Sequence, residues 1–264
     1  MKNILRAAAA ALLLTSCEKV VELDYKGNQS RIVIEANITN QQGPHTVKIR
    51  KSIALTETGA YPTIDNAMVV ISDNAGNSDT LSAQGNGTYH TKTLKGVEGR
   101  TYTMVVTAEN QTYIAQTTMP ARVPFDGIKV EEVVFGGETE FNIIPEYIDP
   151  VARGNSYRFE LLANDKLMNQ HFIQNDEVKN GVKNTARLEL SDDEDLKLKR
   201  GDLITLKMQC VDARVALYYK TLALIGDSGP GGGITPNNPP GNISNGALGI
   251  FSAHTTETKS VTIP

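Results

Sequence analysis

Apolar and polar residues alternate with a period of two along most of this chain, and short turn segments separate the alternating runs. In residues 46–52, for example, the apolar side chains of Val47 and Ile49 alternate with basic ones. Successive side chains of a strand point to opposite faces, so this pattern predicts short strands that each bury one face. In the first part of the chain, the predicted strands are 30–39, 46–52, 67–71, 87–91, 100–108 and 112–118.

The turns of this region contain residues that favour tight backbone bends. Asp73–Asn77 and Gly85–Gly87 are rich in Asp, Asn and Gly, which adopt turn conformations at little cost. Many short strands joined by such turns predict an antiparallel β-sandwich over residues 30–120. The region resembles transthyretin-like or carboxypeptidase-regulatory sandwiches. The residues that carry this resemblance are Ala67, Val69, Ile71, Asp73, Gly76, Gly87, Tyr89, Gly99, Tyr102 and Val106.

A second β-rich region follows the proline-containing segment 120–124. Its predicted strands are 127–135, 140–147, 156–163, 169–173, 185–190, 203–211, 247–251 and 260–264. Apolar residues recur at helical spacing in 213–225, which predicts one short helix. Residues 227–245 are rich in Gly, Pro and Asn, which predicts a long surface loop. The sequence therefore predicts a mainly β protein of two consecutive antiparallel β-sandwich domains, Ig-like or transthyretin-like, at 30–120 and 125–264, with the short helix near the C-terminus.

The first residues match a bacterial lipoprotein signal. A basic start and a short apolar run precede Leu14-Thr15-Ser16-Cys17, which resembles a lipobox. In proteins of that kind, cleavage precedes the Cys and the Cys is acylated, which anchors the chain to a membrane without a spanning helix. We predict a lipoprotein signal peptide at 1–16, lipidation of Cys17 and an N-terminal tether at 17–29. The alternative is an ordinary signal peptide in which Cys17 is incidental.

The charge of the chain argues against some classes of binding partner, and its cysteine content argues against a disulfide. The chain has 264 residues, of which 26 are basic and 30 acidic. Two of the basic residues lie in the predicted signal peptide, so 24 basic residues and a net charge of −6 remain. With no basic stripe, the chain is not expected to bind nucleic acid or anionic membrane surfaces. Once Cys17 is lipidated, Cys210 has no disulfide partner, and its apolar surroundings predict a buried, unreactive thiol.

The sequence contains no motif of nucleophilic catalysis, such as a Gly-x-Ser-x-Gly elbow. The four histidines, His45, His90, His171 and His254, are too far apart in sequence to form a local metal motif. The chain also lacks Trp, the residue that stacks best on sugar rings, although nine Tyr remain. We therefore predict a protein that is not an enzyme and needs no cofactor.

The acidic run 191–195 has two interpretations. Its carboxylates form a weak candidate calcium site, with Asp192, Asp193 and Asp195 as first ligands, because Ca²⁺ prefers oxygen ligands. The run lacks the Gly and the distal Glu of an EF-hand loop. The sequence favours the alternative, a short helical turn with Ser191 as its N-cap and acidic residues near the positive helix end. No metal site is predicted on this basis.

A modification site is indicated in the first β-rich region. Asp79-Thr80-Leu81 resembles the short Asp-Ser/Thr-apolar acceptor pattern of Bacteroidetes O-glycosylation, which makes Thr80 the candidate residue. A pattern of three residues also arises by chance, so an unmodified Thr80 is the alternative. The intact mass of the native protein distinguishes the two.

The mature chain as a whole resembles the Bacteroidetes lipoproteins of the DUF4249 family, a domain of unknown function. The residues that carry this resemblance are Cys17, Ile34–Asn40, Pro62, Asn66-Ala67, Met119-Pro120, Asp149-Pro150, Tyr157–Phe159, Asn175-Asp176 and Pro239–Phe251. The resemblance implies an outer-membrane location and no assigned activity. Members of the family often accompany TonB-dependent outer-membrane receptors, which implies nutrient capture or assembly of an uptake complex.

Several functions are compatible with the sequence and this resemblance. The first is a non-enzymatic accessory or binding module of a TonB-dependent nutrient uptake system, whose small-molecule or glycan ligand the sequence does not identify. The second is a structural or adhesin-like cell-surface lipoprotein, and a third is a hydrolase assembled from distant loops. Glu18 follows Cys17 and is compatible with a surface-export tag, so the anchored protein faces either the cell surface or, as the alternative, the periplasm. The loop 227–245 is predicted to be a contact region or a simple connector.

Overall fold

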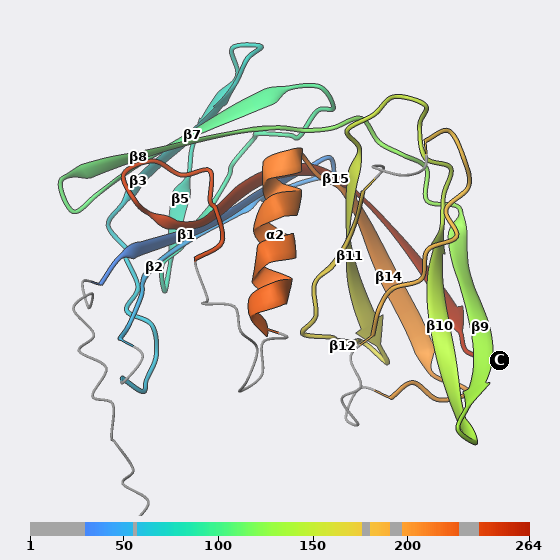
Figure 1. Ribbon diagram of the computed structural model, residues 1–264. Helices are drawn as coiled ribbons and strands as arrows, with labels where there is room; N and C mark the ends of the chain where they lie inside the picture. Colours follow the sequence, from blue (N-terminus) through green and yellow to red (C-terminus); the bar gives the residue numbers. More distant parts are fainter. Residues whose placement is uncertain (1–29, 55–56, 176–179, 191–196, 227–237) are drawn as a thin grey trace, which may run out of the picture.

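The computed structural model describes residues 30–54, 57–175, 180–190, 197–226 and 238–264. These residues form a mainly β structure with one helix (Figure 1), which confirms the predicted fold class. The elements are β1 (Ile32–Thr39), β2 (Thr46–Lys51), β3 (Met68–Asp73), β4 (Ser78–Thr80), β5 (Ser82–Gly85), β6 (Thr88–His90), β7 (Thr101–Ala108), β8 (Gln111–Thr118), β9 (Gly127–Phe135), β10 (Glu138–Glu146), β11 (Ser156–Ala163), β12 (Lys166–Leu167), β13 (Phe172–Asn175), β14 (Leu203–Cys210), α2 (Ala213–Gly226) and β15 (Leu248–Thr262).

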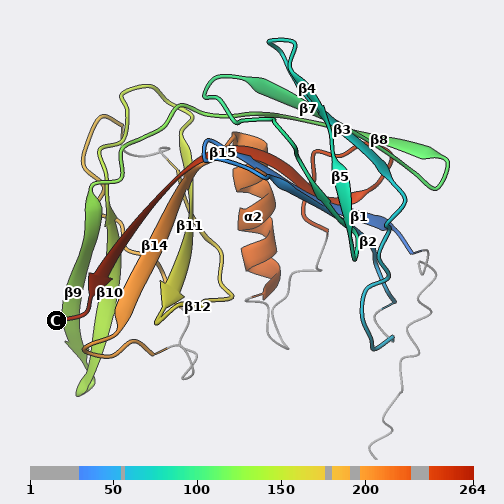
Figure 2. The ribbon, with the colours of Figure 1, turned by 180° about the vertical axis from the view of Figure 1, so that it is seen from behind.

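The strands form three sheets, and the largest sheet joins the two halves of the chain (Figures 1 and 2). Its nine strands follow the order β12-β11-β14-β15-β1-β2-β6-β5, with β13 paired to β11. The four-stranded sheet β4-β3-β7-β8 packs on one half of it, and the two-stranded sheet β9-β10 packs on the other half. Among the described strands, β1 and β15 are the one parallel pair, and all other pairs are antiparallel.

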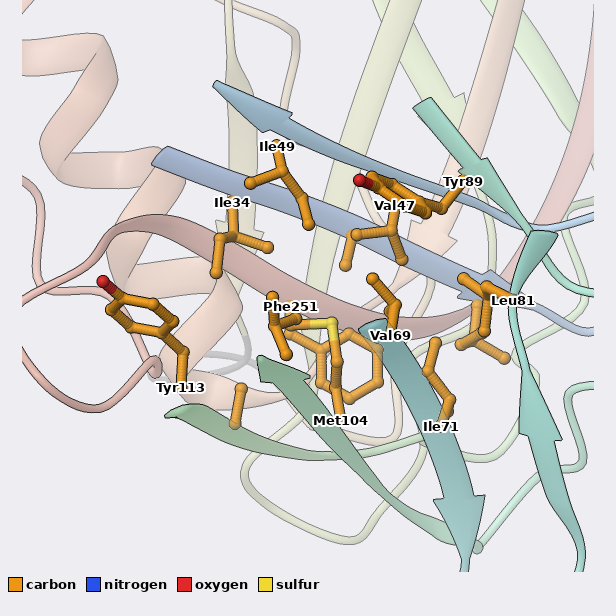
Figure 3. Close-up of a cluster of buried hydrophobic side chains, with 14 of the residues drawn as sticks. Ile34, Val47, Ile49, Val69, Ile71, Leu81, Tyr89, Met104, Tyr113 and Phe251 are labelled. Carbon is orange, nitrogen blue, oxygen red and sulfur yellow. The ribbon is translucent and has the colours of Figure 1, made fainter. Parts of the chain in front are cut away.

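The first hydrophobic core lies between the four-stranded sheet and the nearer half of the large sheet (Figure 3). Ile34 and Ile38 enter this core from alternate positions of β1, as the period-two pattern predicts. Ile71 and Met104 enter from the opposite sheet, and all four side chains are fully buried. Each such side chain stabilises the fold by roughly 1.5–3 kcal/mol relative to an exposed position.

Strand β15 belongs to both halves of the molecule. Its first part pairs with β1 and places Phe251 and Ala253 in the first core. Its last part pairs with β14 and brings Val261 and the following Ile263 to the second core, which lies against β9 and β10. The predicted domain range 125–264 therefore contains a segment that packs in the first core.

Two sequence predictions for this half were wrong in detail. The segments 247–251 and 260–264 were predicted as separate closing strands, but β15 is one continuous strand of 15 residues. Its middle is polar, so an apolar pattern does not reveal it, whereas pairing with β14 satisfies its backbone. Residues 185–190 form no strand, because this segment makes only isolated backbone bonds to β10, such as Leu188 N–H to Ile143 O at 2.8 Å.

The start of β15 depends on Gly249 and on the segment before it. Gly249 has a φ of +98°, and a Cβ there would lie 2.1 Å from the carbonyl oxygen of Ile34, so only glycine fits. The Asn242 side chain accepts from the Phe251 N–H at 2.9 Å and donates to its carbonyl oxygen at 2.7 Å. The described end of the predicted loop, 238–245, is thus fastened to strands, and residues 227–237 lie outside the described residues.

Helix α2 lies against the concave face of the bent large sheet, opposite the face that packs on both cores (Figures 1 and 2). Its bounds confirm the predicted helix at 213–225. The Asp212 carboxylate accepts from the Val215 N–H at 2.9 Å, which caps the helix N-terminus, and also from the hydroxyl of Thr117. Val215 and Ala216 pack on Ile250 of β15, so the helix covers part of this face.

Candidate functional site

The face of the large sheet that carries α2, here called the inner face, is polar where the same strands bury apolar side chains on their other face. In β11, Arg158 and Glu160 alternate with the core residues Tyr157, Phe159 and Leu161. The strand register places Arg158 opposite Gln209 of β14, and Glu160 opposite Lys207. These four side chains therefore meet at one place beside α2.

Glu160 connects the inner-face cluster, which we define as Arg158, Glu160, Lys207, Gln209 and Tyr219. The Glu160 carboxylate accepts from Arg158 Nη1 at 2.7 Å and from Lys207 Nζ at 2.8 Å. Arg158 Nη1 also donates to Gln209 Oε1 at 2.7 Å, and its guanidinium lies 4.0 Å from the centre of the Tyr219 ring. Burial alone would raise the pKa of Glu160, but the charges and hydrogen bonds of Arg158 and Lys207 outweigh burial and lower it to about 2. The carboxylate is therefore ionised.

Two buried histidines, His45 and His254, border this cluster. Burial lowers the pKa of His254 to about 3 and also lowers the pKa of His45, so both rings are neutral near pH 7. The Thr39 N–H donates to His45 Nδ1 at 3.4 Å, which leaves the ring proton on Nε2. His45 Nε2 and Arg158 Nε are both buried donors for which the described residues supply no acceptor.

The cluster lines a hollow of about 340 Å³ between α2, β11, β14 and the β1–β2 connection. This volume lies at the low end of the range of ligand pockets, about 300–1,000 Å³. The side chain of Lys207 is 40% exposed and that of Arg158 is 12% exposed, so Lys207 is the more accessible cation. The other lining residues are mostly neutral and polar: Asn37, Thr39, Gln42, Pro44, His45, Thr46 and His254.

The inner face also holds a Ser–His pair, which is a feature of many hydrolases. Ser252 Oγ lies 2.9 Å from His254 Nδ1, and both residues belong to β15. Ser252 is only 1% exposed and does not line the hollow, so a substrate has no access to its hydroxyl. The pair instead satisfies two buried polar groups.

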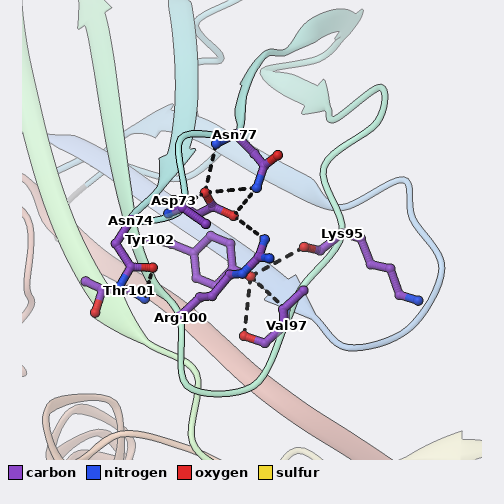
Figure 4. A network of polar contacts seen from close by, with 9 residues as sticks. Asp73, Asn74, Asn77, Lys95, Val97, Arg100, Thr101 and Tyr102 are labelled. Carbon is purple, nitrogen blue, oxygen red and sulfur yellow. Dashed lines mark hydrogen bonds and ion pairs between the residues drawn. The ribbon is translucent and has the colours of Figure 1, made fainter.

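A second buried polar network surrounds Asp73, at the end of β3 (Figure 4). The Asp73 carboxylate accepts from the Ala75 N–H at 3.0 Å, from the Asn77 N–H at 2.9 Å and from Arg100 Nη1 at 2.7 Å. Burial alone would raise the pKa of Asp73, but these bonds and that of the Asn77 side chain outweigh it and lower the pKa. None of the buried polar atoms of this network lacks a partner within the described part of the chain. The network fixes the predicted turn at Asp73–Asn77.

The sequence-predicted site residues do not coincide with the hollow. Four of them lie outside the described residues: Cys17, Asp192, Asp193 and Asp195. Thr80 is exposed on β4, the edge strand of its sheet, and its glycosylation stays a prediction. Across the described ranges, no group of three His, Cys, Asp or Glu side chains is placed to hold a metal ion. In the same ranges, no helix is long and apolar enough to cross a membrane.

Sequence reasoning did not identify the inner-face cluster. Alternating polar positions in a strand predict a solvent-facing side, and nothing in the pattern indicated that α2 and the β1–β2 connection would cover that side. One feature of the sequence could have indicated the cluster: charged residues in the middle of long strands that are otherwise apolar. Arg158, Glu160 and Lys207 each lie in the interior of such a strand.

The comparisons with known proteins concern the family and not a ligand. The chain matches the family described as "Domain of unknown function (DUF4249)" over residues 18–260. Comparison with curated proteins gave no match. Among solved structures, the chain is similar to a two fibronectin type-III domain segment from chicken tenascin, with 14% identity, coverage of 70% of this chain and 93% of that chain, and a TM-score of 0.24. A TM-score this low supports no structural argument. Because the match covers most of its length, the chain belongs to the DUF4249 family, a domain of unknown function.

Proposed function

We propose that this protein is a non-enzymatic binding module that a lipid on Cys17 anchors at the outer membrane. The hollow on the inner face carries this proposal, because it combines paired charges with buried donors for which the described part of the chain supplies no acceptor. Folded proteins satisfy most buried polar groups internally, and groups left without a partner point to a ligand or to bound water. The hydroxyl of the Ser252–His254 pair is buried away from the hollow, which supports binding over catalysis.

The proposed module serves as an accessory of a TonB-dependent nutrient uptake system. The lipobox-like segment at Cys17 supports the anchor, and the resemblance of the chain to lipoproteins that accompany such receptors supports the partner. In this role the hollow holds a cargo molecule near a receptor. The net negative charge of the chain supports no role in nucleic-acid binding.

Affinity purification of the tagged full-length protein from gently solubilised outer membranes tests this function. We expect a TonB-dependent receptor in stoichiometric amount, identified by mass spectrometry, and its loss from a Cys17→Ala variant. Protease treatment of intact cells then determines whether the anchored protein is exposed on the cell surface. Recovery of the anchored protein alone contradicts the accessory role.

A structural or adhesin-like role at the cell surface is the second candidate. Strand β9 favours it, because within the described strands β9 pairs only with β10, and its other edge forms no ladder of backbone bonds. Open strand edges are surfaces on which other chains add a strand. Self-association of the purified protein in sedimentation experiments, without a receptor in the pull-down, is the outcome expected for this role.

A further inference from the structure

The described lining of the hollow has one positive charge in excess. Arg158 and Lys207 are cations, and Glu160 is the one carboxylate among the described lining residues. Both cations bind this same carboxylate, which their charges keep ionised. His254 and His45 are neutral near pH 7 and add no charge. A recessed site with one uncompensated positive charge favours a ligand with one negative charge.

The hydrogen-bonding groups of the lining favour an acceptor-rich ligand. Arg158 Nε and His45 Nε2 are donors without a described acceptor. Gln209 uses its carbonyl oxygen to accept from Arg158, so its amide nitrogen remains as a donor. Lys207 carries three N–H groups, and among the described residues its amine bonds to Glu160. A carboxylate presents about four lone-pair positions and no donor, which complements such a lining.

The rim of the hollow is suited to hydroxyl groups and not to an apolar ligand. Asn37 and Gln42 supply amides, and Thr39 and Thr46 supply hydroxyls, all from β1, β2 and the connection between them. The Tyr219 ring is occupied on one side by the Arg158 guanidinium. Its centre also lies 5.2 Å from the ring of His171 and 5.3 Å from that of Tyr218, so stacking of a ligand on it is restricted.

We infer that this hollow binds a sugar acid of monosaccharide size, a polyhydroxylated molecule with a single carboxylate. Its carboxylate lies against Lys207 and Arg158, and its hydroxyls bond the amides and hydroxyls of the rim. A monoanion balances the excess charge, whereas a phosphate dianion overcompensates it. The hollow of about 340 Å³ accommodates one such ring. This inference names the ligand class of the proposed binding function and rests on it.

Calorimetric titration of the full-length protein in detergent tests the inference. The probes are D-galacturonate and D-glucuronate, with D-galactose and D-glucose as neutral counterparts of the same size. Loss of a charge-assisted hydrogen bond costs about tenfold or more in affinity, so at least one acid is expected to bind at least about tenfold more tightly than its neutral counterpart. Lys207→Gln is expected to weaken that binding by about tenfold, and Lys207→Arg by less than about threefold.

Lys129→Gln is the matched control. Lys129 is an exposed lysine of β9 that pairs with Glu131 at 2.6 Å, so the substitution removes the same charge and one ion pair outside the hollow. The affinity of the Lys129→Gln variant for the two acids is expected to equal that of the unchanged protein. Urea unfolding of each variant shows whether lost binding reflects lost folding.

Three results overturn the inference: no binding of either acid, equal affinity for acid and neutral sugar, or unchanged affinity in a folded Lys207→Gln variant. Any of these, together with a receptor recovered in the pull-down, rejects the ligand class and leaves the proposed function in place. Acid binding that depends on Lys207, without a recovered receptor, supports the ligand class and rejects the uptake role.

Discussion

Two buried polar networks of this protein, around Asp73 and around Glu160, are built from similar residues. They differ in whether all their buried polar atoms have hydrogen-bond partners. Each places a carboxylate against an arginine at 2.7 Å. The Asp73 network closes a turn, and all its buried polar atoms have partners within the described residues. The Glu160 network leaves a donor of Arg158 and one of the adjacent His45 without an acceptor among the residues that the structure describes, and a hollow lies beside it.

This difference separates a structural network from a candidate binding site. A buried polar network stabilises a fold only when its members are satisfied, because each unsatisfied group retains its desolvation cost. A structural role therefore accounts for the Asp73 network without a ligand. The unsatisfied donors at the inner-face cluster retain a desolvation cost that hydrogen bonds to a ligand would offset. The cluster also lies beside a hollow in which a ligand fits.

The largest expected effect comes from Asp73→Ala. The substitution removes the acceptor of several backbone and side-chain donors, so we expect the free energy of unfolding to fall by about 3 kcal/mol. Urea unfolding followed by circular dichroism measures the change. Sugar-acid binding at low denaturant should remain unaltered, because Asp73 does not line the hollow. A loss of binding in the folded variant would mean that the two networks are coupled.

The second effect concerns pH and His254. Burial places its folded pKa near 3, below its ordinary value of 6.5, so the unfolded state binds more protons between these values and stability falls as pH falls. From pH 6.5 to 5 we expect a loss of up to about 2 kcal/mol, since each pKa unit is worth about 1.4 kcal/mol. The carboxylates with lowered pKa, Asp73, Asp79 and Glu160, add their losses only at more acidic pH.

Unfolding midpoints measured at several pH values check this expectation. A His254→Asn variant should show a shallower dependence between pH 6.5 and 5. A residual slope is expected, because burial lowers the pKa of His45 and His171 in the same direction. An unchanged slope in the variant would show that His254 is not the group responsible.

A smaller effect is expected for Ser252→Ala, which tests whether the inner face is catalytic. The substitution leaves His254 Nδ1 without its bond to Ser252 and should cost about 1 kcal/mol. A fluorophosphonate probe for serine hydrolases should label neither the unchanged protein nor the variant, because Ser252 is buried. Labelling that disappears in Ser252→Ala would make the inner face a hydrolase site.

The smallest effect on stability is expected for Lys207→Gln, the substitution that should most affect ligand binding. The side chain of Lys207 is 40% exposed, and ion pairs of exposed lysines contribute only about 0–1 kcal/mol. Urea unfolding should therefore give nearly the same midpoint for this variant and for Lys129→Gln. A loss of several kcal/mol at Lys207 alone would place the inner-face cluster in the same structural class as the Asp73 network.

Much of the fold was predictable from local pattern, whereas the pairing of distant strands was not. The period of two located β1, β2, β7 and β11, and helical spacing located α2. Pattern alone missed the polar middle of β15 and its parallel pairing with β1, because these depend on backbone bonds between segments far apart in sequence. The candidate site was missed for the same reason, since its residues come from β11, β14, α2 and the β1–β2 connection.

The sequence by itself determined the mainly β fold class, the single described helix and the membership of the DUF4249 family. These properties depend on periodicity and on motifs, which are local. Only the tertiary structure decided which polar face is covered. Arg158 and Lys207 occupy alternating strand positions that the pattern predicts to face solvent. They line a candidate site because α2 packs on that face of the bent sheet. Burial and charge balance are properties of the assembled surfaces, so no strand pattern specifies them.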